Sequence, residues 1–271
     1  NELESARSSL ERAVSLNPDN ATYHFRLGLT LQALGNQQGA REAFEEAVSL
    51  DPEQPAHHFN LALVNVALGR YEEAVSNADA AIAIDSSTAA YHFTRGQALS
   101  ELGQVNDAIA AHAEAVRLDE SYVRPLVELG RILQEEGMDD QALEFLLRAE
   151  RLEPNSFEVN NNLGIVYASK ELFDNAITHF RRAVEARQNE TTVRYNLALA
   201  LIEADRLETA QSVLGELVRL DPAYWQAYHR LGEVFVAQED NESARTILTR
   251  LLDQNPDYPA REQVEALLQS L

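Results

Sequence analysis

The chain has 271 residues, more than one compact hydrophobic core usually serves, so its length predicts either two domains or an extended architecture. Its 44 acidic and 22 basic side chains leave a formal net charge of -22, which argues against nucleic acid and anionic lipid as partners. Cysteine is absent, and this excludes disulfides, thiolate metal sites and cysteine nucleophiles.

No apolar run approaches the roughly 18 to 20 residues that span a bilayer, and no secretion signal opens the chain. We therefore expect a soluble protein of the cytoplasm or the periplasm that does not insert into membranes. The sequence starts at Asn1 inside a helical pattern and without an initiator methionine, so we expect a processed form or a piece of a longer protein. Lys170 is the single lysine among the 22 basic residues, a bias that a GC-rich bacterial genome or a salty habitat would produce.

The first expected element is a helix within residues 1–20, with apolar residues at helical spacing and Pro18 near its end. Ala6, Leu10 and Ala13 have the same spacing as residues in the second half of each unit that follows. We interpret residues 1–20 as the second helix of a truncated unit, which leaves one apolar face without its partner helix. Homo-oligomerisation through this exposed helix is one expected mode of assembly.

From residue 21 onward the sequence repeats every 34 residues, with no insertion or deletion. A small residue follows leucine or arginine in each unit, at Gly28, Ala62, Gly96, Gly130, Gly164, Ala198 and Gly232. An alanine stands twelve residues further on in each unit, at Ala40, Ala74, Ala108, Ala142, Ala176, Ala210 and Ala244. The period predicts seven units, 21–54, 55–88, 89–122, 123–156, 157–190, 191–224 and 225–258.

Each unit is expected to form two helices, because its apolar residues recur at helical spacing, as at Tyr23, Leu27 and Leu31. A glycine separates the two helices in the first four units, where a helix end favours a residue that tolerates positive φ: Gly35, Gly69, Gly103 and Gly137. Glu171, Asp205 and Glu239 take this place in the last three units. The small residues on both helices are expected to let them approach closely.

Residues 259–271 are expected to form a capping helix. Val264, Leu267, Leu268 and Leu271 make a single apolar stripe along this segment. The last helix of a repeat array needs one apolar face, because it covers the final unit and turns its other face to water. We therefore expect the C-terminal end of the array to lie here.

These residues give the sequence a resemblance to the tetratricopeptide repeat family over essentially its whole length. The family's pattern appears in unit 157–190 as Leu163, Gly164, Tyr167, Ala176, Phe180 and Ala183, and in unit 225–258 as Tyr228, Leu231, Gly232, Phe235, Ala244, Leu248 and Pro256. Departures such as Ala62 and Ala198 in place of glycine leave the period intact. The resemblance implies an all-α fold, a right-handed superhelical solenoid of antiparallel helix pairs.

The sequence holds no motif of catalysis or of phosphate binding, so we expect neither enzymatic activity nor a cofactor. His24, His58 and His92 recur at the repeat spacing of 34 residues. Neighbouring units are about 8 to 10 Å apart, whereas zinc needs donor atoms at about 2.1 Å. We interpret these histidines as packing residues and expect no metal site.

The resemblance implies that the first helices of the units line a concave groove in which partners bind. The fifth residue of a unit faces this groove in the family, and in the first three units it is Phe25, Phe59 or Phe93. An exposed row of three rings predicts an apolar partner, because exposed rings are costly to hydrate. Burial of the rings against the neighbouring first helices is the alternative.

Polar residues are expected in the same groove, namely Asn60, Asn161, Asn162, Tyr195 and Asn196. An asparagine amide both donates and accepts, so it can pair with a peptide unit of any ligand, although such residues are also common filler in the family. Asn60 with Arg124 or Arg131 would hold a carboxylate. The lysines of the family's clamp for chaperone tails are missing, however, and Glu101, Glu128 and Glu135 lie nearby in the pattern.

The sequence favours a non-catalytic scaffold for protein-protein interaction, which binds a peptide or a helix of a partner in its groove. A second reading is a substrate-recruiting or regulatory segment of a larger enzyme of the glycosyltransferase, peptidase or sulfotransferase type. A third is a self-assembling scaffold. The sequence names neither the partner nor the organism.

Overall fold

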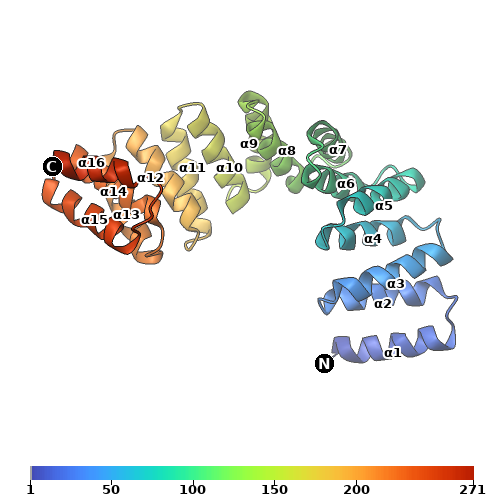
Figure 1. Ribbon diagram of the computed structural model, residues 1–271. Helices are drawn as coiled ribbons and strands as arrows, with labels where there is room; N and C mark the ends of the chain where they lie inside the picture. Colours follow the sequence, from blue (N-terminus) through green and yellow to red (C-terminus); the bar gives the residue numbers. More distant parts are fainter. Residues whose placement is uncertain (1) are drawn as a thin grey trace. The chain divides into compact units, whose positions relative to one another are not determined.

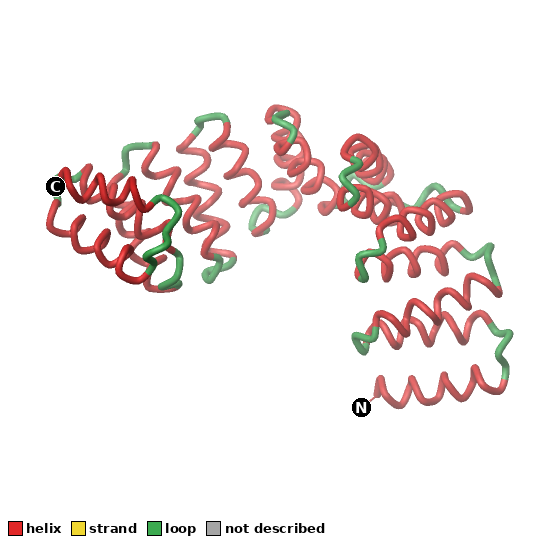
Figure 2. Tube along the Cα trace, in the orientation of Figure 1, coloured by secondary structure: helices red, strands yellow, loops and turns green. Residues whose placement is uncertain are grey.

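The computed structural model describes residues 2–271, and within this range it consists of helices joined by short loops, with no strand (Figures 1 and 2). The all-α fold expected from the sequence is confirmed. The helices are α1 (Glu2–Leu16), α2 (Ala21–Ala33), α3 (Gln37–Leu50), α4 (Pro55–Ala67), α5 (Tyr71–Ile84), α6 (Ala89–Glu101), α7 (Val105–Leu118), α8 (Val123–Glu135), α9 (Asp139–Leu152), α10 (Phe157–Ser169), α11 (Phe173–Ala186), α12 (Thr191–Glu203), α13 (Leu207–Leu220), α14 (Trp225–Ala237), α15 (Asn241–Gln254) and α16 (Arg261–Ser270).

Two compact units make up the chain, an N-terminal unit that ends at Ile132 and a C-terminal unit that starts at Leu133. In the N-terminal unit α2 packs on α3, α4 on α5 and α6 on α7, and in the C-terminal unit α10 packs on α11, α12 on α13 and α14 on α15. The predicted pairing of consecutive helices is therefore present in both. The seven boundaries drawn from the sequence period remain an interpretation of the repeat.

The two helices of a pair approach closely because the first helix carries a small residue opposite a large one. A Cβ atom added to Gly28 would lie 2.5 Å from the Phe44 ring, and one added to Gly164 would lie 2.5 Å from the Phe180 ring. Real Cβ atoms do not come this close to another carbon, so no side chain fits there. The close approach predicted from the small residues is confirmed at these pairs.

The turn between the helices of a pair needs a left-handed residue. Gly35, Gly69, Gly103 and Gly137 have φ values of 81°, 72°, 70° and 73°. The turn closes when the amide of Asn36 donates to the carbonyl of Leu31 at 2.9 Å, as a helix ending in a left-handed residue does. Three acidic residues adopt the same conformation in the C-terminal unit: Glu171 at 59°, Asp205 at 55° and Glu239 at 64°.

Asp205→Gly is expected to raise the free energy of unfolding by about 1 kcal/mol. A left-handed conformation costs a residue with a Cβ about 1 to 2 kcal/mol, and glycine removes this cost. The larger conformational entropy of glycine in the unfolded chain offsets part of the gain. The reverse change, Gly103→Asp, should lower the stability by a similar amount. Urea unfolding of both variants at neutral pH measures the difference. Equal stability of Asp205→Gly and the unmodified chain would contradict the assigned strain.

A hydrogen bond ties the start of several first helices to the loop before them. His24 Nε2 lies 2.7 Å from the carbonyl oxygen of Pro18, and His58 Nε2 lies 2.9 Å from that of Pro52. His92, Asn160 and Arg194 make the same contact with the carbonyl six residues before them, at 3.1, 2.8 and 2.8 Å. The histidine series thus caps backbone carbonyls, a role that the packing interpretation missed. Among residues 2–271, no three His, Asp or Glu side chains are grouped to hold a metal ion.

Replacing His58 tests this contact. His58→Leu should lower the stability by about 1 kcal/mol, because the Pro52 carbonyl loses its donor. His58→Asn should retain most of it, since Asn160 makes the equivalent bond in its own unit. Urea denaturation of the two variants gives the comparison, and a leucine variant as stable as the asparagine variant would show that the bond contributes nothing.

The two end helices differ in how their apolar residues are covered. No residue of α1 is buried, and Leu3 and Leu16 are 40% and 77% exposed. In α16, Val264 is buried, and Leu267 and Leu268, with Leu271 just after the helix, pack on a cluster that includes Tyr228 and Leu251. None of the described helices has both the length and the hydrophobicity of a bilayer-spanning segment.

Candidate binding site in the C-terminal unit

A cavity of about 500 Å³ opens between helices of the C-terminal unit. It is lined by Ile165 and Ala168 of α10, Phe173 and Phe180 of α11, Asn196, Leu199, Ala200, Ile202 and Glu203 of α12, and Arg230 of α14. Apolar side chains make most of this lining, and three polar side chains stand among them. A concave apolar surface with a few polar groups is the usual form of a binding site.

The cavity exists because α10 and α12 carry apolar residues on two sides. Leu197 and Leu201 of α12 are only 4% and 0% exposed in the core of the unit. Leu199 and Ile202 of the same helix stay partly exposed, although Ile202 also packs against this core. Ile165 is the equivalent of Leu199 one repeat earlier, so the repeat brings a matching aliphatic residue to the same surface.

The polar residues of the cavity differ in their pairing. The Arg230 guanidinium donates to Glu233 at 2.8 Å and also bonds to the side chain of Tyr195, so its charge is engaged. Glu203, the last residue of α12, has no ion-pair partner among the described residues. Of the two charged lining residues, Arg230 is therefore paired, and Glu203 offers a carboxylate without an ion-pair partner in residues 2–271.

The predicted polar groove residues of the C-terminal unit are only in part at this cavity. Asn196 lines it. Tyr195 packs on Tyr224 with ring centroids 5.2 Å apart, and Asn161 and Asn162 lie partly exposed on α10. Sequence reasoning missed Ile165, Leu199 and Ile202. The sequence could have pointed to them, because two consecutive repeats carry apolar residues at these same positions in addition to the apolar residues that form the core of each helix pair.

The aromatic row predicted in the N-terminal unit does not present three free rings. Phe93 is only 2% exposed and lies between the rings of His112 and Tyr122, at 5.4 and 5.2 Å. Phe25 and Phe59 are partly exposed and contact His57 and Tyr91, each at 4.9 Å. The expectation of an exposed row is wrong for Phe93, because its ring packs between His112 of its own repeat and Tyr122, which lies directly before the next repeat. We leave Phe93 out of the binding surface.

The remaining predicted residues of the N-terminal unit have partners within the chain. Asn60 donates to the carbonyl of Ala56 at 2.8 Å, one helical turn earlier. The guanidinium of Arg124 lies 4.5 Å from the centre of the Phe93 ring, and that of Arg131 donates to Glu128 at 2.9 Å. A carboxylate ligand would have to compete with these contacts.

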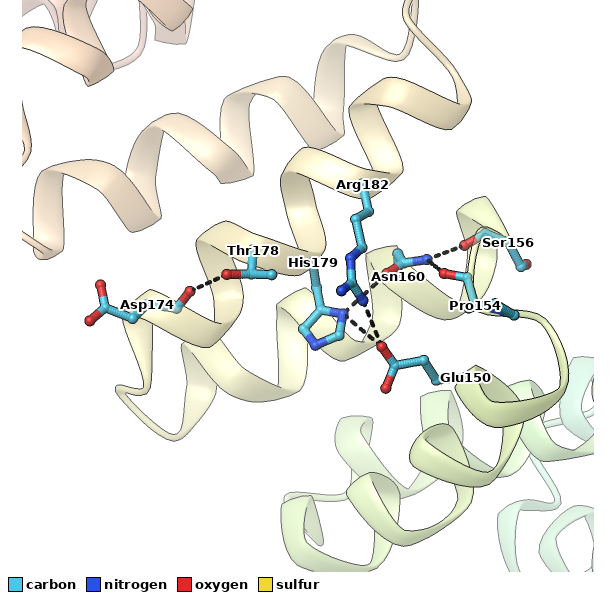
Figure 3. A network of polar contacts seen from close by, with 8 residues as sticks. All are labelled: Glu150, Pro154, Ser156, Asn160, Asp174, Thr178, His179 and Arg182. Atoms are coloured by element: carbon cyan, nitrogen blue, oxygen red, sulfur yellow. Dashed lines mark hydrogen bonds and ion pairs between the residues drawn. The ribbon is translucent and has the colours of Figure 1, made fainter.

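Figure 3 shows a buried polar network of the C-terminal unit that joins α9, α10 and α11. The Asn160 amide nitrogen donates to the carbonyls of Pro154 and Ser156, both at 2.8 Å, so its oxygen is left to accept from His179 Nδ1 at 3.1 Å. Burial lowers the pKa of His179, although the nearby Glu150 carboxylate opposes this shift. Glu150 itself pairs with Arg182 at 2.8 Å. The network links these three helices to one another, and none of its four residues lines the cavity.

Three sequence profiles of the tetratricopeptide repeat match the chain. One matches residues 1–55, 26–89, 59–123 and 127–191, another matches residues 205–271, and a third matches residues 192–216. Together they cover nearly every residue. Among curated proteins, no sequence matches the chain.

Solved structures of similar fold come from several sources. The C-terminal part of a TPR repeat-containing protein from Cytophaga hutchinsonii is 17% identical, with a TM-score of 0.73 over 89% of this chain and 98% of that one. YrrB, described as a TPR protein with an unusual peptide-binding site, is 22% identical, with a TM-score of 0.58 over 70% of this chain and 98% of that one. Yeast Tom70 is 21% identical, with a TM-score of 0.57 over 99% of this chain and 58% of that one. At these identities the likeness concerns the fold.

Proposed function

We propose that this chain, which belongs to the tetratricopeptide repeat family, is a protein-interaction scaffold whose C-terminal unit binds a segment of a partner protein. The observation that carries the proposal is the cavity of about 500 Å³ in which Ile165, Leu199 and Ile202 stay partly exposed. YrrB, with the same fold, is described as having a peptide-binding site, which supports this use of the architecture.

The lining of the cavity suits one apolar side chain of a bound segment. Burial of apolar surface contributes about 25 cal/mol per Å², so a leucine-sized side chain gains about 2 kcal/mol by leaving water. Asn196 stands beside the aliphatic residues and is able to donate to, or accept from, the backbone of the segment. The cavity thus offers an anchor point together with a sequence-independent contact.

The proposal concerns binding and not catalysis. The buried polar network around Asn160 and His179 is explained by its contacts within the fold. Recruitment of substrates to an attached enzyme and self-assembly through residues 1–20 remain further predictions from the sequence.

Selection of a displayed library of random dodecapeptides against the full chain tests the proposal. We expect the selected peptides to bind the unmodified chain and to lose at least about tenfold in affinity, or about 1.4 kcal/mol, when Leu199 and Ile202 are both replaced by serine. Leu220→Ser is the matched control, because Leu220 is 43% exposed and lies outside the cavity. Peptides that bind the double variant as tightly as the unmodified chain would place the binding site elsewhere and refute the proposal.

A further inference from the structure

We infer that the segment held in the cavity is basic: an apolar side chain enters between Ile165, Leu199 and Ile202, and neighbouring lysine or arginine side chains face the carboxylates of Glu171, Glu203 and Asp205. This inference rests on the proposed function and specifies the chemistry of the ligand. Two observations support it: the carboxylates lie at or next to the ends of helices that line the cavity, and the nearby arginine and lysine side chains are paired with other acids.

The three carboxylates belong to residues at, or just after, the C-terminal ends of the lining helices α10 and α12. The lining residues Ala168 and Ile202 lie in the last turns of α10 and α12, and Phe173 begins α11. Glu171 lies in the turn between Ala168 and Phe173, while Glu203 is itself a lining residue and Asp205 follows it by two. Glu203 thus ends α12 at the cavity wall, while Glu171 and Asp205 lie in the turns that follow α10 and α12.

The cations near the cavity are already neutralised. Arg230 pairs with Glu233 at 2.8 Å, Lys170 with Asp140 at 2.7 Å, and Arg206 with Asp174 at 2.6 Å. None of the three carboxylates, by contrast, has an ion-pair partner in the described part of the chain.

The ends of α10 and α12 add to this negative potential, because the last carbonyls of a helix carry a partial negative charge. The site therefore attracts positive charge and repels negative charge.

Local structure does not favour acidic residues at these turns. Glu171 and Asp205 hold positive φ values of 59° and 55°, where the equivalent residues of four other turns are glycine. They also stand at helix C-terminal ends, where a negative charge is unfavourable. Glu239 has the same conformation in the turn after α14, away from the cavity lining. The inference therefore rests on the apolar lining and the unpaired carboxylates beside it.

Charge complementarity also decides between occupants. A second copy of this chain has a net charge of -22 and would be repelled from the acidic end of the cavity. An acidic peptide would meet the same repulsion. A segment that carries an apolar residue with basic neighbours satisfies both halves of the site.

Four synthetic peptides of eleven residues test the inference on the full chain. The first has a central leucine flanked by two lysines on each side in a glycine-serine background. The second has glutamine in place of the lysines, the third has glutamate there, and the fourth has glycine in place of the leucine. Methyl NMR of Ile165, Leu199 and Ile202 reports occupancy of the cavity, and the titrations are run at low and at high salt.

We expect the lysine-leucine peptide to shift these methyl resonances and to bind about tenfold more tightly than the glutamine-leucine peptide at low salt, as a few exposed ion pairs would produce. The difference should shrink to about twofold at 0.5 M NaCl, because salt screens exposed charges. The glutamate-leucine peptide should bind most weakly of the three that contain leucine.

Variants of the chain separate the acidic end from general charge attraction. Glu203→Gln, and Glu171→Gly combined with Asp205→Gly, should each weaken the lysine-leucine peptide about threefold and leave the glutamine-leucine peptide unchanged. The glycine variants should remain folded, since glycine relieves the left-handed strain at these turns. Glu185→Gln is the matched control, because Glu185 is an unpaired acid near the end of α11, away from the turn that begins this helix.

The outcomes distinguish the inference from the function on which it rests. If the glutamine-leucine peptide shifts the cavity methyls as strongly as the lysine-leucine peptide at low salt, the basic ligand is refuted and the apolar binding site stands. If the glycine peptide binds as tightly as its leucine counterpart, or if no peptide shifts these methyls, the proposed use of the cavity fails as well. Tightest binding of the glutamate peptide would also refute the inference.

Discussion

Gly164→Ala should destabilise the C-terminal unit by about 2 kcal/mol. The new Cβ atom would lie 2.5 Å from both Cδ1 and Cε1 of the Phe180 ring, and Phe180 is itself 2% exposed with no room to retreat. Overpacking of this kind costs about 1 to 3 kcal/mol, and a rigid ring in the core belongs at the upper end of that range. The gain in helix propensity from glycine to alanine returns about 1 kcal/mol, so the overlap prevails. Urea unfolding monitored by circular dichroism measures the effect.

The chain supplies the control for this prediction. In the next 34-residue repeat, Ala198 is the equivalent of Gly164 and Leu214 is the equivalent of Phe180. Ala198 and Leu214 are both fully buried. Phe180→Leu in the Gly164→Ala background should therefore restore most of the lost stability, whereas Phe180→Leu alone should lower it by about 1 to 2 kcal/mol. Additive effects of the two changes would show that the ring and the glycine are not coupled.

Much of the fold could be predicted because its determinants are local. Gly35 predicts a helix end, since the left-handed turn needs a residue without a Cβ, and the turn has φ of 81° there. Gly28 predicts a close contact between helices, because nothing larger fits beside Phe44. Each of these residues acts within its own helix pair. The repeat then copies the same local solution along the chain.

The candidate site was harder to predict from the sequence, because it depends on contacts between neighbouring 34-residue repeats. Phe93 belongs to the predicted groove by its place in the repeat. Its ring is nevertheless covered by Tyr122 and Arg124, which lie where the next 34-residue repeat begins. Leu199 and Leu201 are chemically alike, and only packing shows that one is buried while the other lines a cavity. Hydrogen bonds such as that of His58 to Pro52 require the position of a backbone carbonyl, which the residue types do not reveal.

His112 is the least satisfied polar side chain of the N-terminal unit. Its ring is fully buried, and neither ring nitrogen has a hydrogen-bond partner among the described residues. It occupies the place that Phe44 and Phe180 hold in other units, and it contacts Gly96 as those rings contact their own glycines. Burial, aided by the positive charge of Arg131, lowers the pKa of His112 to about 4. The folded protein therefore holds this ring neutral where an unfolded chain would protonate it.

His112→Phe should accordingly stabilise the protein, by about 2 kcal/mol at pH 7.5, because two buried nitrogens without partners are removed. The gain should grow as the pH falls. A neutral histidine contributes its full stability above the unfolded pKa of 6.5 and loses it as the pH drops toward the folded pKa of about 4. The difference between the two pKa values corresponds to about 3 kcal/mol of folding stability, which the protein with His112 loses and the phenylalanine variant keeps. Urea unfolding of both proteins at pH 7.5 and pH 4.5 isolates the histidine, since all carboxylates are common to both. A gain that stays constant with pH would mean that His112 has the same pKa in the folded and the unfolded chain, and would refute the prediction.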